Sequence, residues 1–315
     1  MKKLIIIVAS LLCASSVFGQ DLATLTETYN SGITANEAGN VELALQSFKE
    51  ALVMAEALGE EGAEIATNCK NSIPILMFSI AKKAANAAEY DKAVAGLKET
   101  IEAATKYGVD NIVDEASVVI PQVLMQKAND AFNDKNFAAA ADAYKEVLAV
   151  DPSNGNAYLR LGAALKATGD KEAAVEAYKA AIENGQEKVA TKQIVNLYQQ
   201  EAAASLKTKK YDDAIAAALE SAKYDATNAK AYQIAGTAAS NGGKTKQAIE
   251  YFEKYLELAP DAKNSGDILF SIGVSYQQLK DNAKAKEYYQ KAIEDPAKIK
   301  PGSLEKAKAI IAALK

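Results

Sequence analysis

One stretch near the middle of the chain constrains the fold more than any other: residues 155–188, GNAYLRLGAALKATGDKEAAVEAYKAAIENGQEK. In its first half, apolar and small residues recur at helical spacing, at Tyr158, Leu161, Gly162 and Leu165. This spacing predicts that they form one face of a helix. Gly169 and Asp170 interrupt this spacing and predict a tight turn. Helical spacing then resumes at Ala173, Ala174, Tyr178, Ala181 and Ile182. The stretch therefore predicts a hairpin of two short helices.

The same pattern occurs seven times along the chain. Each copy has a small residue early in its second helix, here called the anchor: Ala44, Ala93, Ala140, Ala174, Ala214, Ala248 and Ala285. A large residue follows four positions later in six copies, at Phe48, Leu97, Tyr144, Tyr178, Phe252 and Tyr289, whereas the fifth copy has Ala218. Another small residue lies twelve positions before each anchor, at Gly32, Ala81, Ala128, Gly162, Ala202, Gly236 and Gly273. We expect the small residues to let the two helices approach closely, with the large side chain filling the space beside them.

This order of small and large positions resembles the tetratricopeptide repeat, a helical hairpin of about 34 residues. The resemblance covers residues 25–299 and implies an all-α fold, a right-handed superhelical array of about seven hairpins with a C-terminal capping helix. The copies are expected near 25–58, 74–107, 121–154, 155–188, 195–228, 229–262 and 266–299. Such a resemblance is specific for fold and says little about function.

The second and third copies are each preceded by extra residues that are helix-like in composition, GAEIATNCKNSI and VDNIVDEASVVI. One interpretation is a lengthened first helix that Pro74 or Pro121 kinks or restarts. The alternative is a short loop before an ordinary helix. A milder extension is expected before the fifth copy, around residues 188–194.

The N-terminal residues 1–19 are typical of a secretory signal peptide, with two lysines before a short apolar core. A lipoprotein signal with Cys13 as the lipidated residue is the alternative, although Leu12 is large for the preceding position. That apolar core is shorter than the ~20 residues that span a bilayer. We therefore expect an exported protein of the periplasm or cell envelope. Residues 20–24 are expected to form a mobile N-terminal tail.

Residues 300–315 predict the capping helix that a repeat array needs to cover its last apolar surface. Pro301 and Gly302 would break the preceding structure, and Ser303 could cap the helix. The covering face would consist of Leu304, Ala307, Ile311 and Leu314.

The composition excludes or disfavours several classes of function. The chain has no histidine, and after signal removal Cys69 would be its single cysteine, so a thiol–imidazole metal site and His-dependent catalysis are impossible. We expect Cys69 to be buried, with a mixed disulfide to a partner as the alternative. The formal net charge of −5 without a basic stripe disfavours nucleic acid as a partner. No phosphate-binding or nucleophile motif is present, so we expect no enzyme, cofactor or metal.

In the family that the chain resembles, first helices line a concave groove that binds extended peptides or single helices. The resemblance therefore implies a partner-binding groove at Tyr29, Met125, Asn129, Phe132, Leu159, Ala163, Asn196, Gln199, Gln233, Thr237, Phe270, Val274 and Gln277. The alternatives are that Phe132 and Phe270 pack within the array and that the amides are solvated. A clamp for a C-terminal carboxylate, known in this family, is incomplete because Met125 stands at the lysine position.

These features predict a non-catalytic protein–protein interaction scaffold that binds a peptide or helix of unknown identity. An envelope protein that binds glycan or cell wall by stacking its tyrosines on sugar rings is one alternative. A purely structural role through self-association of the array is another.

Overall fold

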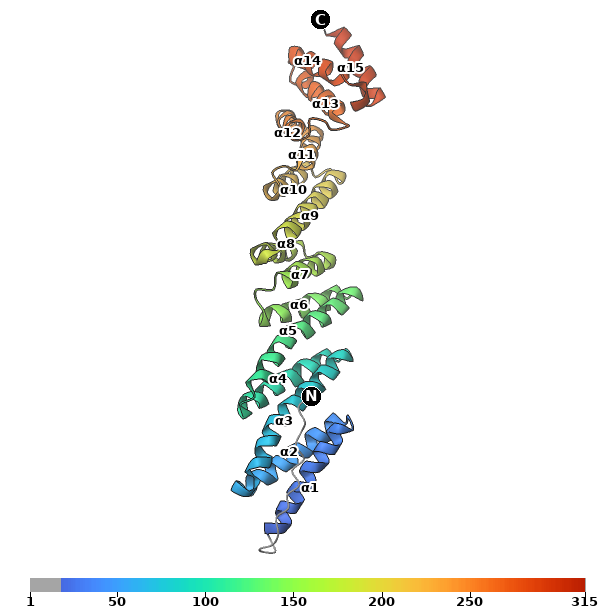
Figure 1. Ribbon diagram of the computed structural model, residues 1–315. Coiled ribbons are helices and arrows are strands. Elements are labelled where there is room, and N and C mark those ends of the chain that lie inside the picture. Colours follow the sequence, from blue (N-terminus) through green and yellow to red (C-terminus); the bar gives the residue numbers. More distant parts are fainter. Residues whose placement is uncertain (1–17, 315) are drawn as a thin grey trace. The chain divides into compact units, whose positions relative to one another are not determined.

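The structure is a computed structural model, and it describes residues 18–314 (Figure 1). Residues 1–17, which hold most of the predicted signal peptide and Cys13, lie outside the described residues. The chain divides into two units, with the boundary between Thr168 and Gly169. Every regular element in the described part is helical, so the all-α fold is confirmed.

In unit 1, each helix packs against the one before it and the one after it along the chain. Its elements are α1 (Phe18–Glu37), α2 (Val41–Ala57), η1 (Gly59–Gly62), α3 (Ala63–Asn86), α4 (Tyr90–Tyr107), α5 (Asp110–Asn133), α6 (Phe137–Val150) and α7 (Gly155–Thr168). The first helices of the second and third copies, α3 and α5, also touch each other. These contacts form a helical repeat array.

Unit 2 has the same chain-order packing, and the first helices α9 and α11 are again in contact. Its elements are α8 (Lys171–Ala181), η2 (Ile182–Gln186), α9 (Glu187–Lys207), α10 (Tyr211–Tyr224), α11 (Ala229–Asn241), α12 (Thr245–Leu258), α13 (Ser265–Gln278), α14 (Asn282–Ile293), η3 (Pro296–Lys298) and α15 (Pro301–Ala313).

The small and large positions of the repeat form the core. All seven anchors are fully buried, and the six large residues four positions later are at most 3% exposed. In three copies the small residue on the first helix is a glycine pressed against the large ring, as in Gly32 with Phe48. In the fourth copy, Gly162 lies in unit 1 and the second helix of the hairpin lies in unit 2. The close approach expected between them therefore stays a prediction.

The turn inside each hairpin has the same backbone conformation in all seven copies. The residue five positions before each anchor has a positive φ between 60° and 89°: Gly39, Ala88, Lys135, Gly169, Lys209, Gly243 and Lys280. In six of the seven copies its N–H donates to the carbonyl three residues back, and the next N–H reaches the carbonyl five residues back, as in Lys135 to Phe132 and Asn136 to Ala131. This Schellman-type ending satisfies carbonyl groups of the first helix and reverses the chain.

The extra residues before the second and third copies lengthen the first helices. Both α3 and α5 have 24 residues, and α9 has 21. The expectation of a restart is wrong, because α3 runs through Pro74 and α5 runs through Pro121. Proline removes one helix hydrogen bond, but Pro74 is fully buried on the face of α3 that also buries Ile73 and Leu76, so its ring contributes to the packed core.

Two expectations about the ends need correction. Residues 20–24 are not a tail but belong to α1, where Leu22 and the buried Leu25 pack on the first core cluster. At the other end α15 is the capping helix, but Lys300 takes the N-cap position and Pro301 the first turn, so Ser303 lies inside the helix. Proline suits the first turn of a helix because the missing N–H would be unpaired there.

Candidate protein-binding grooves

The first-helix side of unit 2 contains a groove between α9 and the start of α11, with a volume of about 860 Å³. We call it the α9–α11 groove. Its polar lining comes from α9, the start of α11 and the turn before it: Glu187, Lys188, Thr191, Lys192, Asn196, Gln199, Asp225, Thr227, Asn228 and Lys230. The extension of α9 supplies Lys188 and Lys192, so the extra turn builds part of the groove.

The amides of this groove are partly organised by the chain itself. Gln199 Nε2 donates to Asn228 Oδ1 at 2.9 Å, which links α9 to the residue that caps α11. The turn before Asn228 is held by Asp225, whose Oδ1 accepts from the N–H and hydroxyl of Thr227 at 3.0 and 2.7 Å. The side chain of Asn196 has no hydrogen-bond partner within the described residues. A bound backbone would therefore find Asn196 available and Gln199 held in place.

The lining of the α9–α11 groove has a small positive excess, three lysines against the two acids Glu187 and Asp225. Lys188, Lys192 and Lys230 are exposed, and none has an ion-pair partner within 4 Å in the part of the chain that the structure describes. Of the two acids in the lining, Asp225 is engaged with Thr227. Carboxylates of a partner would be attracted at this end of the groove.

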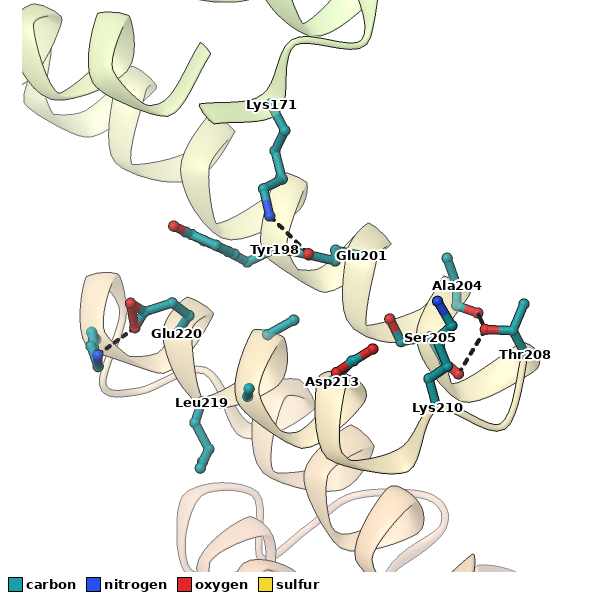
Figure 2. Close-up of a pocket in the computed structure, with 13 residues that line it drawn as sticks. Lys171, Tyr198, Glu201, Ala204, Ser205, Thr208, Lys210, Asp213, Leu219 and Glu220 are labelled. Carbon is teal, nitrogen blue, oxygen red and sulfur yellow. Dashed lines mark hydrogen bonds and ion pairs between the residues drawn. The ribbon is translucent and has the colours of Figure 1, made fainter. Parts of the chain in front are cut away.

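A second groove of about 870 Å³ lies on the other side of α9, between α8 and α10 (Figure 2). We call it the α8–α10 groove, lined by Lys171, Tyr198, Glu201, Ser205, Asp213 and Glu220. Lys171 Nζ lies 2.7 Å from Glu201 Oε1 and 5.5 Å from the centre of the Tyr198 ring. Lys171 is therefore paired within the chain, as is Lys223 of the same lining, which forms an ion pair with Glu220.

The pKa values of Lys171 and Tyr198 in the α8–α10 groove are both raised. Burial lowers the pKa of Lys171, but the hydrogen bond and charge of Glu201 outweigh it, so the net pKa is raised. Burial raises the pKa of Tyr198, and Tyr224 and Glu220 add to the rise. Among the described residues, each resolved shift moves a carboxyl pKa down or a tyrosine, lysine or cysteine pKa up. General acid–base catalysis needs a group with a pKa near the working pH, and these shifts move away from it.

Several predicted groove residues turn out to belong to the repeat core. Tyr29 is 3% exposed with its ring 5.5 Å from that of Phe48, so its assignment to a partner groove is wrong. Phe270 is half-buried with its ring 5.4 Å from that of Tyr289, and Val274 packs on the same cluster. The packing alternative for Phe270 therefore describes this residue, and Tyr29 and Val274 pack in the same way.

In unit 1 the predicted residues Met125, Asn129 and Phe132 lie on α5 and are half-buried. Asn129 Oδ1 accepts from the Tyr144 hydroxyl at 2.8 Å, and the Phe132 ring meets Phe137 edge-on at 5.2 Å. Leu159 on α7 and Ala163 are also half-buried. Asn129 and Phe132 thus contact the second helix of their own hairpin, α6.

The remaining predicted residues lie on α11 and α13. Thr237 Oγ1 donates to the Gln233 carbonyl at 2.8 Å, and Gln277 Oε1 accepts from the Tyr289 hydroxyl at 2.9 Å. Asn196 and Gln199 are thus the predicted residues that the structure brings together in a groove. Sequence reasoning missed Lys188, Lys192 and Lys230, although the four-residue spacing of the first two places them on one helix face.

The structure also bears on the thiol, the tyrosines and the possible metal ligands. Cys69 is a buried free thiol, as expected, and burial raises its pKa to about 12. Tyr144, Tyr178 and Tyr289 are at most 1% exposed, so their rings are not available to stack on sugars. The described residues hold no group of three or more acidic or cysteine side chains arranged for a metal ion. None of the described helices has the length and apolar character for crossing a membrane.

Comparison with known families identifies the repeat. A tetratricopeptide repeat model matches residues 125–188, and a second tetratricopeptide repeat model matches residues 229–262 and 266–294. The chain is a tetratricopeptide repeat protein. Repeats of this family serve as protein–protein interaction scaffolds, so a protein is the indicated partner of this tetratricopeptide repeat protein.

Individual relatives are more distant. The photosystem I assembly protein Ycf3 of Prochlorococcus marinus is 36% identical over 63 residues. The match spans 20% of this chain and 36% of that relative, about a third of its length.

Solved structures that are similar to this tetratricopeptide repeat protein include the MamA protein, with 25% identity over 55% of this chain and 90% of MamA and a TM-score of 0.34. YrrB, described as a tetratricopeptide repeat protein with an unusual peptide-binding site, is 20% identical over 59% and 91% of the two chains, with a TM-score of 0.34. The P58(IPK) repeat domain is 15% identical over 92% and 99%, with a TM-score of 0.32.

Proposed function

We propose that this protein is a non-catalytic scaffold that binds a segment of a partner protein in the α9–α11 groove. The observation that carries the proposal is the gathering of Asn196 and Gln199 with Lys192 and Lys230 in one groove of about 860 Å³. Amides at regular positions can pair with the backbone of an extended peptide or with polar side chains of a helix. The unpaired lysines then select for segments that carry carboxylates.

The partner is a protein or peptide rather than a nucleic acid, because the chain as a whole carries a net charge of −5. The scaffold needs no cofactor, since binding rests on a surface that stacked helices hold in place. We place the protein in the periplasm or cell envelope, on the strength of residues 1–19, which have the features of a secretory signal peptide.

Site-specific photo-crosslinking in the native host tests the groove. A photoreactive residue is placed at Thr191, which lines the α9–α11 groove, and in a matched chain at Val53, which is 71% exposed on α2. We expect a small, reproducible set of exported proteins to crosslink at position 191 and not at position 53.

The double substitution Lys192→Glu and Gln199→Ala, combined with the crosslinker at Thr191, should remove this set. Lys98→Glu, at an exposed position on α4 outside the groove, serves as the matched charge reversal. Identical sets at positions 191 and 53, or a set that survives the double substitution, would show that partners bind elsewhere.

A further inference from the structure

A small cleft in unit 1 lies between the second helices α2 and α4, with α3 beneath it, and has a volume of about 250 Å³. We call it the α2–α4 cleft. Leu45, Met77 and Ile80 line it and are each only half-buried, so they leave apolar surface open to solvent. Ala84 and Gly96 line it from α3 and α4, and Lys49 stands on α2. Ala84 on α3 and Gly96 on α4 are small, which leaves the space beside the larger Leu45, Met77 and Ile80 open.

The same place in the last copy of the repeat is filled by the chain itself. Tyr288 lies three positions after the anchor Ala285, and its ring stacks on Tyr276 of α13 with centres 5.4 Å apart. Its hydroxyl donates to Glu253 Oε1 of α12 at 2.6 Å. Tyr288 therefore reaches from α14 across α13 to α12 and ties two neighbouring second helices together.

Repeat numbering places the α2–α4 cleft at these same three positions. Gly96 follows its anchor by three residues, as Tyr288 does, and Ala84 follows the small residue of its first helix by three, as Tyr276 does. Lys49 follows its anchor by five residues, as Glu253 does. The second copy thus lacks both rings, and an ammonium group stands where the last copy has a carboxylate.

We propose that the α2–α4 cleft binds an aromatic side chain of a partner protein that carries a carboxylate beside that ring, with the carboxylate facing Lys49. The volume suits one ring, since an apolar cavity of about 150 Å³ already accepts benzene. An aromatic side chain would cover Met77 and Ile80 and gain the burial energy that the chain's own tyrosines gain in the last copy. This surface is on the second-helix side and is independent of the α9–α11 groove.

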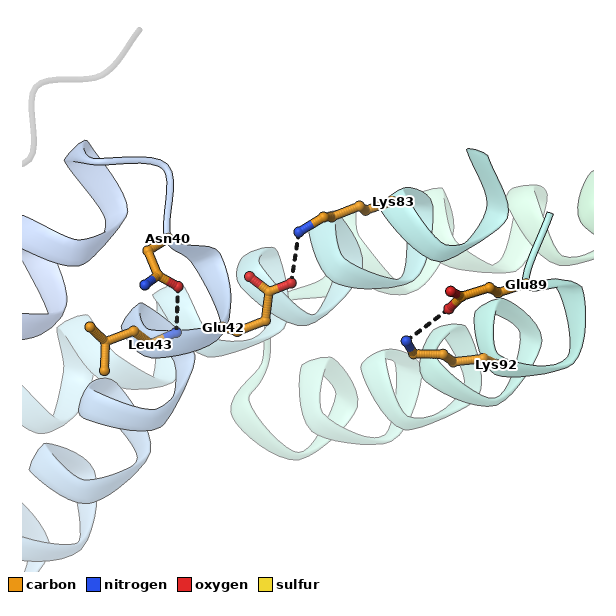
Figure 3. Close-up of polar contacts among 6 residues, drawn as sticks. All are labelled: Asn40, Glu42, Leu43, Lys83, Glu89 and Lys92. Carbon is orange, nitrogen blue, oxygen red and sulfur yellow. Dashed lines mark hydrogen bonds and ion pairs between the residues drawn. The ribbon is translucent and has the colours of Figure 1, made fainter. Parts of the chain in front are cut away.

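In the part of the chain that the structure describes, the two walls of the cleft carry opposite unpaired charges, Lys49 on α2 and Glu99 on α4. Lys83 is paired with Glu42 at 2.9 Å, and Lys92 with Glu89 at 2.8 Å (Figure 3). Lys49, by contrast, has no ion-pair partner within the described residues. A partner's carboxylate would therefore pair with Lys49 on the α2 wall and stay away from Glu99 on the α4 wall.

The α8–α10 groove shows what an unsuitable lining looks like at the same repeat position. Tyr198 and Glu201 stand there where the α2–α4 cleft has Met77 and Ile80. Glu201 pairs with Lys171, so a ring entering there would have to displace an ion pair. The aromatic proposal therefore applies to the second copy and not to the fifth or the last.

Methyl NMR of the full chain tests the proposal, because methionine occurs at just four positions, Met1, Met54, Met77 and Met125. Met77 reports on the cleft, and Met125 serves as an internal control on α5. The probes are three acetylated tripeptide amides, Glu-Tyr-Glu, Glu-Ala-Glu and Lys-Tyr-Lys. The variants are Ala95→Tyr, at an exposed residue that lines the cleft, Lys49→Gln, and the control Ala138→Tyr at an exposed position on α6.

We expect Glu-Tyr-Glu to shift the Met77 methyl signal saturably while Met125 stays in place, and Glu-Ala-Glu to have no such effect. Lys-Tyr-Lys should bind about fivefold more weakly, as expected for an exposed charge pair worth ~1 kcal/mol. In the Lys49→Gln variant, Glu-Tyr-Glu and Lys-Tyr-Lys should bind with nearly equal affinity. Ala95→Tyr should abolish the shift of the Met77 signal, and Ala138→Tyr should leave it unchanged.

An unmoved Met77 signal would overturn the proposal. So would equal responses to Glu-Tyr-Glu and Glu-Ala-Glu, or a charge preference that Lys49→Gln leaves unchanged. If the Met77 signal moves with protein concentration alone, a second copy of the chain fills the cleft and the partner proposal is wrong. Crosslinking at Thr191 is unaffected by all of these outcomes, so the proposed function is tested separately.

Discussion

Gly273 on α13 faces the ring of Tyr289 on α14 so closely that a Cβ atom at position 273 would lie 2.8 Å from both Cδ1 and Cε1 of the ring. Real Cβ atoms do not approach neighbours this closely. Gly32 with Phe48 and Gly236 with Phe252 show the same relationship, at 2.8 and 2.5 Å. Helix spacing in these hairpins is therefore set by the absence of one side chain and the size of another.

Gly273→Val should destabilise the last hairpin by about 1–3 kcal/mol, because the added atoms overpack the contact with Tyr289. Valine and glycine differ by only a few tenths of a kcal/mol in helix propensity, so packing dominates the result. Urea unfolding followed by circular dichroism measures the change. Gly302→Val in α15, where an added Cβ meets nothing within 4 Å, is the control and should change stability little. Equal effects at the two positions would show that the ring contact does not control stability.

Gly243→Ala should destabilise the chain by about 1–2 kcal/mol through backbone conformation alone. Its φ is +72°, a region that L-residues with a Cβ disfavour, and an added Cβ would meet nothing within 4 Å. The matched change Gly302→Ala, inside α15, should stabilise slightly because alanine favours helix. Differential scanning calorimetry should show melting temperatures that move in opposite directions for the two variants. A shift in the same direction would remove the argument from positive φ.

Cys69 should be unreactive in the folded chain and contribute to a loss of stability at alkaline pH. Burial raises its pKa from 9.0 to about 12. Because the folded pKa is above the unfolded one, the contribution is fully present below pH 9 and is lost as the pH rises toward about 12. A chain of residues 20–315, which lacks Cys13, should react with iodoacetamide at pH 8 only when urea is added, since the thiolate is the nucleophile.

Cys69→Ala provides the control for alkaline unfolding, and it should flatten the decline in unfolding free energy above pH 9. Rapid alkylation of the folded chain at pH 8 would contradict the burial of this thiol.

Ala307→Asp should unfold or detach α15, because Ala307 is fully buried against Ala285 and Tyr289. Burying an unpaired carboxylate costs several kcal/mol, so the helix would leave its place rather than bury the charge. Limited proteolysis should then cleave within residues 300–313, and light scattering should reveal association through the uncovered apolar surface. Ala309→Asp, at an exposed position of the same helix, should behave like the unchanged chain.

Much of the fold could be predicted because its determinants are local and repeated. The anchors, the large residues such as Tyr289, and the helical spacing are visible in the letters, and the capping face of α15 follows from its periodicity. The positive φ at Lys135, Lys209 and Lys280 was less accessible, since a glycine marks that position in only some copies. It becomes evident only when the turn hydrogen bonds are compared between copies.

The candidate site was only partly predictable. A family pattern assigns Tyr29 and Phe270 to a groove by their position on first helices, but each ring turns toward the large residue of its own hairpin. Burial of an aromatic ring outweighs its exposure, and periodicity does not reveal which neighbour it meets. Lys230 joins Lys192 in the α9–α11 groove because α9 and α11 touch, which is a contact between distant parts of the chain.

The sequence by itself determined that the chain forms helical hairpins, where each one turns, and that Gly32, Gly236 and Gly273 face the large ring of their own hairpin. These properties depend on neighbours within about 34 residues, the length of one repeat. The tertiary structure alone decided that α3 and α5 continue through their prolines, that Gly96 and Ala84 leave a cleft where Tyr288 and Tyr276 fill one, and which lysines remain unpaired. Those outcomes depend on packing between successive repeats, where the space left by one side chain is set by residues from three different helices.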